Sequence, residues 1–199
     1  IRLALLSVTP APDGLPDAYV RRLFDEYAPR FENALIERLA YRAPAAIRAA
    51  VDSVATGRAF RTMLDLGCGT GLAGTAFRSM TERLDGVDIS PRMVAEARKK
   101  NIYDGLVVEN LVTFLRAAPH PYDLVIAADV LVYFGALEQL FQTVRQKITP
   151  DGIFAFTLQA LNEGTFNLGA EHRYSHNCAY VRAVAPATGF EVRQLADGV

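Results

Sequence analysis

The sequence contains few of the residues that staple small extracellular domains. It has no tryptophan and only two cysteines, Cys68 and Cys178, which lie far apart in different contexts. Two distant cysteines do not form a disulfide framework, and such usage is typical of a protein in a reducing compartment. We therefore expect a cytoplasmic protein.

Long apolar runs and an excess of charge of one sign are also missing. No apolar run approaches the roughly 20 residues of a membrane-spanning helix, and residues 2–6 are too short and poorly flanked for a signal peptide. The formal net charge is -1, and no basic stripe dominates the chain. Composition therefore argues against a membrane or nucleic-acid partner. The 199 residues, 51% of them hydrophobic, fit one globular domain with a sizeable core.

The first sixteen residues have the composition of a linker. The chain begins at Ile1 rather than Met, and residues 8–16 contain three prolines and a glycine. We expect residues 1–16 to be the end of a preceding region, and residues 17–199 to be the functional domain of a longer protein.

Residues 17–54 have apolar side chains at helical spacing. Leu23, Tyr27 and Phe31 form one such set, and a second follows between residues 35 and 39. Pro29 and Pro44 are expected to divide the region into separate helices. Its aromatic residues pack these helices onto the main domain, or one or two of them cap a ligand. We expect a helical lid over residues 17–56.

From residue 60 onward, strand patterns alternate with helical patterns. This alternation predicts an α/β core over residues 60–199, with a doubly wound, mostly parallel, Rossmann-like sheet whose ligand lies at the carboxyl ends of the strands. The expected strands are residues 62–66, 83–89, 105–108, 122–128, 153–158 and 190–195.

The segment 65–71, DLGCGTG, follows the first expected strand and precedes a helix. Its glycines let a ligand approach bare backbone at the start of that helix. The segment 69–74 also matches the G-x-G-x-x-G spacing of dinucleotide binding, a weak signal when it stands alone. Asp65 separates the two interpretations, because a carboxylate repels a pyrophosphate and attracts a cationic ligand. Charge therefore favours S-adenosylmethionine over NAD.

A second acid, Asp88, ends the second expected strand, 21 positions after Gly67 (88 − 67). An acid at this place accepts hydrogen bonds from both ribose hydroxyls of a nucleotide ligand. The alternative is an acid that stabilises the helix beginning after Ser90 through the helix dipole. We favour the ribose role, because the spacing and the strand end coincide.

These motifs resemble those of the class I S-adenosylmethionine-dependent methyltransferases. Segment 65–71 is similar to the first motif of that family, and 86–93, GVDISPRM, to the motif that follows. Segment 122–131 is similar to the family's fourth strand, and 148–152 to its usual lead into strand five. Segments 23–31 and 41–44 are similar to a bacterial subgroup that is often fused behind tetratricopeptide repeats. The resemblance therefore implies an N-terminal repeat domain in the full-length chain.

The resemblance implies a cofactor site for S-adenosyl-L-methionine. Asp65 and the turn residues Gly67, Cys68, Gly69 and Gly71 would hold the methionine moiety, and Asp88 the ribose. The other implied contacts are Ile89 and Met93 against the adenine, Asn110 and Leu111 after strand three, Ala128 and Asp129 beside the methyl group, and Tyr27 and Phe31 in the lid. The family usually has aspartate at Asn110; the amide oxygen can still accept the adenine amino bond.

The catalytic residues and the methyl acceptor are less defined by the sequence. The segment after strand four lacks the Asn/Asp-Pro-Pro-aromatic stretch of adenine and glutamine methyltransferases, which leaves a small molecule or a protein side chain as the substrate. His172 and His176 are candidate bases for an amine or hydroxyl acceptor, or part of a polar loop. Tyr133 and Arg173 are candidate substrate contacts. A metal site at His172, His176 and Cys178 lacks a fourth ligand, so no metal is expected.

Two other functions are compatible with these motifs. A domain can keep the cofactor site and serve only as a partner or scaffold, and an NAD-dependent oxidoreductase would share the glycine spacing.

The family's sheet also needs a seventh strand after residues 190–195, which the last four residues do not provide.

Overall fold

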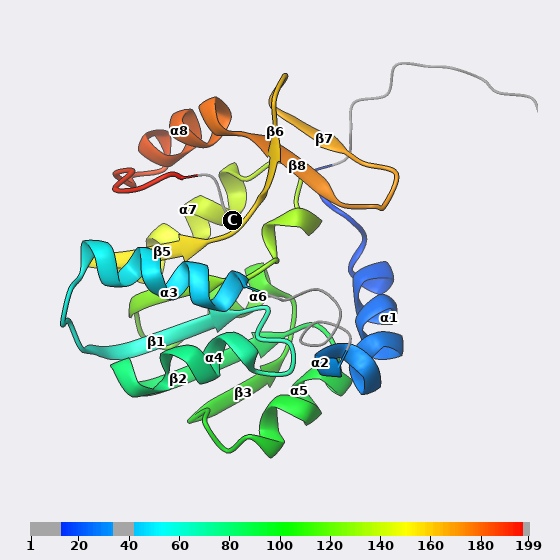
Figure 1. The fold of residues 1–199 in the computed structure, drawn as a ribbon, viewed down its shortest axis with the longest axis vertical. Coiled ribbons are helices and arrows are strands. Elements are labelled where there is room, and N and C mark those ends of the chain that lie inside the picture. Colours follow the sequence, from blue (N-terminus) through cyan, green and yellow to red (C-terminus); the bar gives the residue numbers. More distant parts are fainter. Residues whose placement is uncertain (1–12, 34–41, 197–199) are drawn as a thin grey trace, which may run out of the picture.

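The computed structural model describes residues 13–33 and 42–196. The expectations for residues 1–12, for the apolar set between 35 and 39, and for the last three residues lie outside the described residues. Figure 1 shows the arrangement of the elements.

The first helices are divided by proline, as the sequence predicts. Helix α1 (Asp17–Tyr27) is followed by the 3-10 turn η1 (Ala28–Arg30), which contains Pro29, and by the short α2 (Phe31–Asn33). Pro44 lies in the first turn of α3 (Ala43–Val54), where its missing N–H has no helical partner to lose.

The main sheet has five strands in the described residues, in the order β3-β2-β1-β4-β5, and all neighbours are parallel. This order reverses direction beside β1, so the carboxyl ends of β1 and β4 flank a crevice of the kind that binds ligands in such sheets. The prediction of a doubly wound parallel sheet is confirmed. The strands are β1 (Phe60–Leu66), β2 (Thr81–Asp88), β3 (Gly105–Val108), β4 (Tyr122–Ala127) and β5 (Ile148–Phe156).

Both faces of the sheet are covered, which explains why β4 is buried along its whole length. On one face, α3 and α4 pack Ile47, Val51 and Phe77 against Met63 and Leu124. A second cluster on the other face joins strand residues to the apolar sides of later helices. The remaining helical elements are α4 (Leu72–Phe77), η3 (Arg78–Met80), α5 (Pro91–Lys99), α6 (Leu111–Ala117), η4 (Leu131–Tyr133), α7 (Glu138–Gln146) and α8 (Cys178–Ala187).

Helix α3 belongs to the core of the domain. Its Ile47 and Val51 are 3% and 1% exposed, and the helix lies along the sheet beside α4 (Figure 1). Among the described residues of the expected lid, 17–33 and 42–56, α1, η1 and α2 lie away from the sheet, near the start of α5.

A second, three-stranded sheet occupies the segment after β5. Its strands are β6 (Gln159–Leu161), β7 (Phe166–Leu168) and β8 (Tyr174–Asn177), in the order β6-β8-β7, with β7 antiparallel to β8. The sequence indicated a polar stretch here and did not predict the sheet. Strand β8 packs against η4. The small sheet therefore supports the chain that follows β4.

The prediction of a strand over residues 190–195 is wrong. After α8 the chain is irregular from Phe190 through residue 196. Phe190 packs its ring against Phe141 and Phe154 instead, with centroids 6.1 and 5.9 Å away. The alternation of apolar and polar residues over 190–195 therefore reflects this packing rather than pairing in the sheet.

The segment before α1 is fixed beside η4. The Leu15 amide donates to the Tyr133 carbonyl at 3.0 Å, and the Gly135 amide donates to the Asp13 carbonyl at 2.9 Å. These backbone bonds set where α1 begins. No helix among the described residues is long and apolar enough to cross a membrane.

Candidate functional site

The glycine turn after β1 has the backbone that its sequence predicts. Gly67, Gly69 and Gly71 all have positive φ, at 67°, 53° and 90°, which L-residues rarely adopt. A Cβ at Gly67 would also lie 2.4 Å from the Val130 side chain. The amides of Gly67 and Cys68 donate to the Val87 carbonyl at 2.8 and 3.0 Å. The turn is therefore tied to the end of β2, and only glycine fits at its first position.

Asp65, just before this turn, is fully buried. Its Oδ2 accepts a hydrogen bond from the Tyr103 hydroxyl at 2.7 Å, while Oδ1 has no partner. Burial raises the pKa of Asp65 to about 7, against the hydrogen bond from Tyr103. The carboxyl group is thus only partly ionised near neutrality. Asp65 therefore favours a cationic ligand less strongly than a fully ionised carboxylate would.

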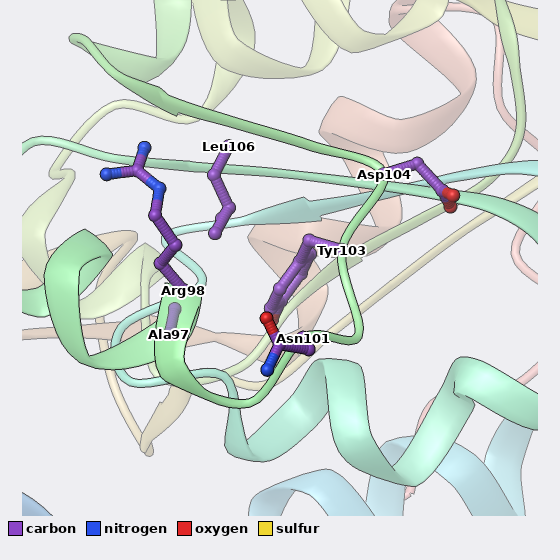
Figure 2. Close-up of a pocket in the computed structure, with 6 residues that line it drawn as sticks. All are labelled: Ala97, Arg98, Asn101, Tyr103, Asp104 and Leu106. Atoms are coloured by element: carbon purple, nitrogen blue, oxygen red, sulfur yellow. The ribbon is translucent and has the colours of Figure 1, made fainter.

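Tyr103 explains two further glycines. A Cβ at Gly74 would lie 2.2 Å from the Tyr103 hydroxyl oxygen, and a Cβ at Gly86 would lie 2.8 Å from its ring. Gly74, which completes the G-x-G-x-x-G match, therefore makes room for a tyrosine. A cavity of about 180 Å³ on the outside of this region is lined by Tyr103, Asn101 and other residues between α5 and β3 (Figure 2). It does not include the glycine turn.

Asp88 lies at the end of β2, facing the turn. Its Oδ2 accepts from the Gly69 amide at 2.9 Å and its Oδ1 from the Ser90 amide at 2.8 Å. Burial raises its pKa to about 6, and the two backbone donors oppose this rise. Ser90 itself caps α5 by accepting from the Met93 amide at 3.1 Å. Both roles considered for Asp88 are therefore compatible, because each carboxylate oxygen can accept a further bond.

Asn110 caps α6 and also contacts the lid. Its Oδ1 accepts from the amides of Val112 and Thr113 at 2.9 and 3.1 Å. Its amide nitrogen donates to both carboxylate oxygens of Asp17 at 3.0 Å. An adenine amino group would have to share this oxygen with two backbone donors. Leu111, the next residue, is buried in the core.

The end of β4 is held in an unusual conformation. Asp129, which follows Ala128, has φ 57°, a region in which aspartate is one of the few tolerated non-glycine residues. Its amide donates to the Thr157 hydroxyl at 2.9 Å, and that hydroxyl donates to Asp129 Oδ1 at 3.0 Å. The ends of β4 and β5 are thereby joined beside the glycine turn.

The lid lies over this edge of the sheet through aromatic and charged contacts. Phe31 is the neighbour a Cβ at Gly69 would meet, at 3.8 Å, and its ring packs edge-on against Tyr27. Glu32 pairs with Lys100 at 2.7 Å. Asp25 accepts from the Ser90 hydroxyl at 2.6 Å. The structure thus places the Phe31 ring against Gly69 and the Tyr27 ring against Phe31.

Two candidate bases occupy different environments. His176 is fully buried in β8, with Nε2 3.0 Å from the Gly135 carbonyl; burial lowers its pKa and keeps the ring neutral. His172 is exposed at the β7–β8 turn, with φ 56° and its ring 5.6 Å from that of Tyr19.

Cys68 is buried, which raises its thiol pKa well above the ordinary value. No cluster of three or more metal-ligating side chains occurs in residues 13–33 and 42–196.

Tyr133 lies between the lid and the small sheet. Its ring packs edge-on against Phe24 at 5.4 Å. Burial raises its pKa; the charge of Arg173 opposes this, and Asp129 and Asp88 add to it. The structure thus brings Arg173 close to Tyr133, which precedes it by 40 positions (173 − 133), and to the nearby Asp129.

Several site residues escaped the sequence analysis. Tyr103 belongs to no sequence motif, and its contacts with Gly74 and Gly86 form only in the folded chain. Asp17, Asp25 and Glu32 looked like ordinary surface acids of a helix. Only their partners, Asn110, Ser90 and Lys100, show that they fasten α1 and α2 to the α/β core.

Comparison with known proteins agrees with this geometry. Residues 64–154 match the family described as "Methyltransferase domain". The chain is 31% identical over 104 residues, 48% of its length, to a probable S-adenosylmethionine-dependent methyltransferase, CRG1, of Saccharomyces cerevisiae. It is 29% identical over 103 residues, 52% of its length, to a malonyl-[acyl-carrier protein] O-methyltransferase of Enterobacter lignolyticus. It spans 35% and 41% of these two relatives.

Solved structures show the same fold. Magnesium protoporphyrin IX methyltransferase from Synechocystis, with bound S-adenosylmethionine, superposes with a TM-score of 0.69 at 18% identity, covering 92% of this chain and 91% of that one. Residues 64–154 are thus similar in sequence to this methyltransferase family, and most of the chain has the fold of solved methyltransferase structures.

Proposed function

We propose that this chain is the catalytic domain of an S-adenosylmethionine-dependent methyltransferase that acts on a small molecule or a protein side chain. The observation that carries the proposal is the buried Asp88 carboxylate bonded to the Gly69 amide, opposite three left-handed glycines at the sheet's switch point. The matched methyltransferase domain supports it.

The residues present fit the cofactor. Among the described side chains, a Cβ at Gly69 would meet only the Phe31 ring, at 3.8 Å, so this ring alone covers the bare backbone of the turn there. Two carboxyl groups, Asp65 and Asp88, are buried here, and one oxygen of Asp65 has no partner. Lys100, a nearby cation, is already paired with Glu32. The oxygens of these carboxyl groups accept hydrogen bonds, so they suit hydroxyl and ammonium groups and suit a pyrophosphate poorly. This disfavours the NAD alternative.

In this proposal, the chain's own residues bind the cofactor and exclude water. Asp88 accepts hydrogen bonds from the ribose hydroxyls, Ile89 and Met93 flank the adenine, and the backbone of the glycine turn meets the methionine moiety. Tyr27 and Phe31 close the site against solvent. When bound, S-adenosylmethionine supplies an activated methyl group, so the chain needs no nucleophile of its own and has to align the acceptor beside Asp129.

Calorimetry with two ligands tests the cofactor assignment. We expect S-adenosylhomocysteine to bind and NADH not to bind. Asp88→Ala should weaken S-adenosylhomocysteine roughly 10- to 100-fold, because it removes both the ligand bonds and the bond that orders Gly69. Asp151→Ala, an exposed acid on β5, is the matched control and should leave the affinity unchanged. NADH binding without S-adenosylhomocysteine binding would reject the proposal.

A separate assay distinguishes an enzyme from a silent binding module. The protein is incubated with methyl-labelled S-adenosylmethionine and a metabolite panel. Transfer of label that is lost in Asp88→Ala supports catalysis. Tight cofactor binding without transfer to any acceptor class would favour the scaffold alternative.

A further inference from the structure

Two hydrogen-bond donors at the carboxyl end of β4 lack partners. The Arg173 guanidinium forms no hydrogen bond or ion pair in the described part of the chain, and its Nε is buried. The hydroxyl group of the half-buried Tyr133 forms no hydrogen bond within the described residues either. The two are close enough for the Arg173 charge to act on the phenol. A buried guanidinium nitrogen without a hydrogen-bond acceptor is costly, and such groups in proteins are normally paired.

The nearby charges do not satisfy these donors. Asp129 and Asp88 both act electrostatically on Tyr133, but neither pairs with Arg173. Asp129 Oδ1 holds the Thr157 hydroxyl at 3.0 Å, and Asp88 holds the Gly69 and Ser90 amides. Among other cations, Lys100 is occupied by Glu32 and Arg92 by the Asp25 carbonyl. Arg173 is therefore available to a ligand.

The walls around the two donors come from separate parts of the chain. Tyr133 ends η4, and its ring contacts Phe24 of α1. Arg173 and His172 lie at the turn before β8, where the His172 ring faces Tyr19 of α1. Helix α1 and the turn before β8 thus meet beside the two donors.

The histidines near this place are poorly arranged to remove a proton. The His176 ring contacts the Gly135 carbonyl inside the small sheet, and the His172 ring lies on Tyr19 near solvent. An acceptor that is already ionised at neutral pH requires no general base. A carboxylate, whose ordinary pKa is about 4, meets this condition.

We propose that the methyl acceptor is a carboxylate, held by the Arg173 guanidinium and the Tyr133 hydroxyl. This inference rests on the proposed methyltransferase function. In the reaction, a carboxylate oxygen forms the new O–CH₃ bond while the S–CH₃ bond breaks and its electron pair stays on sulfur. A methyl ester and S-adenosylhomocysteine result, no proton is transferred, and no oxidant is needed.

A carboxylate fits this place better than a phosphate group. One guanidinium and one neutral phenol can pair with a single negative charge in the geometry that planar carboxylates favour. A second negative charge would lie near Asp129 and Asp88 without a further cation to offset them.

Binding of simple carboxylates to the protein saturated with S-adenosylhomocysteine tests the inference without relying on turnover. The probes are propionate, glutarate and octanoate, each compared with its amide, and inorganic phosphate, all measured by calorimetry. We expect at least one carboxylate to bind ten or more times more tightly than its amide, and phosphate to bind more weakly than that carboxylate.

Variants locate the binding. Arg173→Gln should weaken the best carboxylate at least tenfold, Arg173→Lys should retain part of the affinity, and Tyr133→Phe should weaken it severalfold. Arg182→Gln, an exposed arginine on α8, is the matched control and should have no effect. Should Arg173→Gln fail to fold, Arg173→Lys and Tyr133→Phe carry the comparison.

The outcomes separate this inference from the proposed function. If S-adenosylhomocysteine does not bind, the proposed function fails first. If it binds but carboxylates bind no better than amides, phosphate binds more tightly, or Arg173→Gln has no effect, only the carboxylate inference is wrong. As a further readout, label transferred to an acceptor should be released by mild alkali as volatile methanol, which a methyl ester yields and an N- or C-methyl product does not.

Discussion

The two halves of the ligand edge are built differently. In the half proposed for the cofactor (the cofactor half), at the ends of β1, β2 and β3, the polar groups are bonded to the chain itself: Asp65 to Tyr103, Asp88 to two amides and Asn110 to the α6 backbone. In the half proposed for the acceptor (the acceptor half), formed by η4 and the β7–β8 turn, the buried Arg173 Nε has no partner among the described residues, and the half-buried Tyr133 hydroxyl forms no hydrogen bond there.

This difference is physically reasonable. A site for one fixed cofactor gains from polar groups that are ordered before binding, because little is then lost in ordering them. Unpaired donors in the acceptor half are costly without a ligand, so we expect a bound substrate to supply their hydrogen-bond acceptors. The cofactor half is therefore expected to respond to mutation through stability and cofactor affinity, and the acceptor half through acceptor binding.

The largest effect is expected from Asp65→Asn. The folded-state pKa of Asp65, about 7, lies above its ordinary 3.8, so between these values the folded protein retains a proton that the unfolded chain has released. This contribution to stability is fully present below pH 4 and is lost as pH rises to about 7. The stability of the wild-type protein relative to Asp65→Asn should therefore fall with pH, by on the order of 4 kcal/mol.

Urea unfolding of both proteins between pH 4 and 8 measures this difference. Asp88, with its raised pKa, is present in both proteins and cancels in the comparison. Asp151→Asn, on the surface, controls for the general effect of removing an acid and should track the wild type. Parallel pH profiles for wild type and Asp65→Asn would show that the buried carboxyl group does not titrate as described.

A somewhat smaller effect is expected from Gly74→Ala. Its new methyl group would overlap the Tyr103 ring, whose hydroxyl lies 2.2 Å from the Cβ position. Overpacking of this kind costs about 1–3 kcal/mol and should also weaken S-adenosylhomocysteine, because it displaces the start of α4. The double variant Gly74→Ala with Tyr103→Leu should recover part of both losses. Additive losses in a double-mutant cycle would contradict a contact between the two residues.

The sequence was informative for the cofactor half because its features are local. The glycine turn, Asp88 and Asn110 each follow a strand pattern directly, and parallel strands bring their carboxyl ends to one edge of a sheet. The fold class followed from the alternation of strand and helix patterns. The sequence could not place Tyr103, because its contacts with Gly74, Gly86 and Asp65 depend on residues 17 to 38 positions away (103 − 86 and 103 − 65).

The acceptor half was poorly predicted because it is assembled from distant segments. The small sheet pairs short strands of three or four residues, such as β6 with β8, whose paired residues lie 16 positions apart (175 − 159). Such strands are too short for a clear period-2 pattern. The expected strand at 190–195 failed for a related reason, since its apolar residues pack on Phe141 and Phe154 from outside the sheet.

The two histidines of the small sheet allow a direct contrast. His176→Gln should destabilise the protein by about 1–3 kcal/mol, because it leaves the buried Gly135 carbonyl without its ring partner. His172→Gln should change stability by less than about 0.5 kcal/mol, because the side chain is exposed. Urea unfolding at pH 7.5 measures both, and equal effects would contradict their assignment to different environments.

The same pair predicts a pH dependence. The folded-state pKa of His176 is lowered, so the unfolded chain binds a proton that the folded protein does not. Stability is fully present above the ordinary pKa of about 6.5 and falls as pH drops below it. This loss should be absent in His176→Gln and present in His172→Gln. An acid limb that is unchanged in His176→Gln would assign it to other groups.

A small effect is expected where α1 meets Asn110, at the edge of the cofactor half. Asp17→Ala removes the carboxylate that receives the Asn110 amide, but it leaves the Asn110 cap of α6 intact. The pair is exposed, so its loss should cost only about 0.5–1 kcal/mol. Because α1 would dock less firmly, we expect S-adenosylhomocysteine to dissociate about two- to fivefold faster in stopped-flow displacement. Glu26→Ala, which removes an exposed acid of the same helix paired only with Arg22, should leave the rate unchanged. Equal rates in wild type and Asp17→Ala would mean that the Asp17–Asn110 contact does not hold the lid over the cofactor.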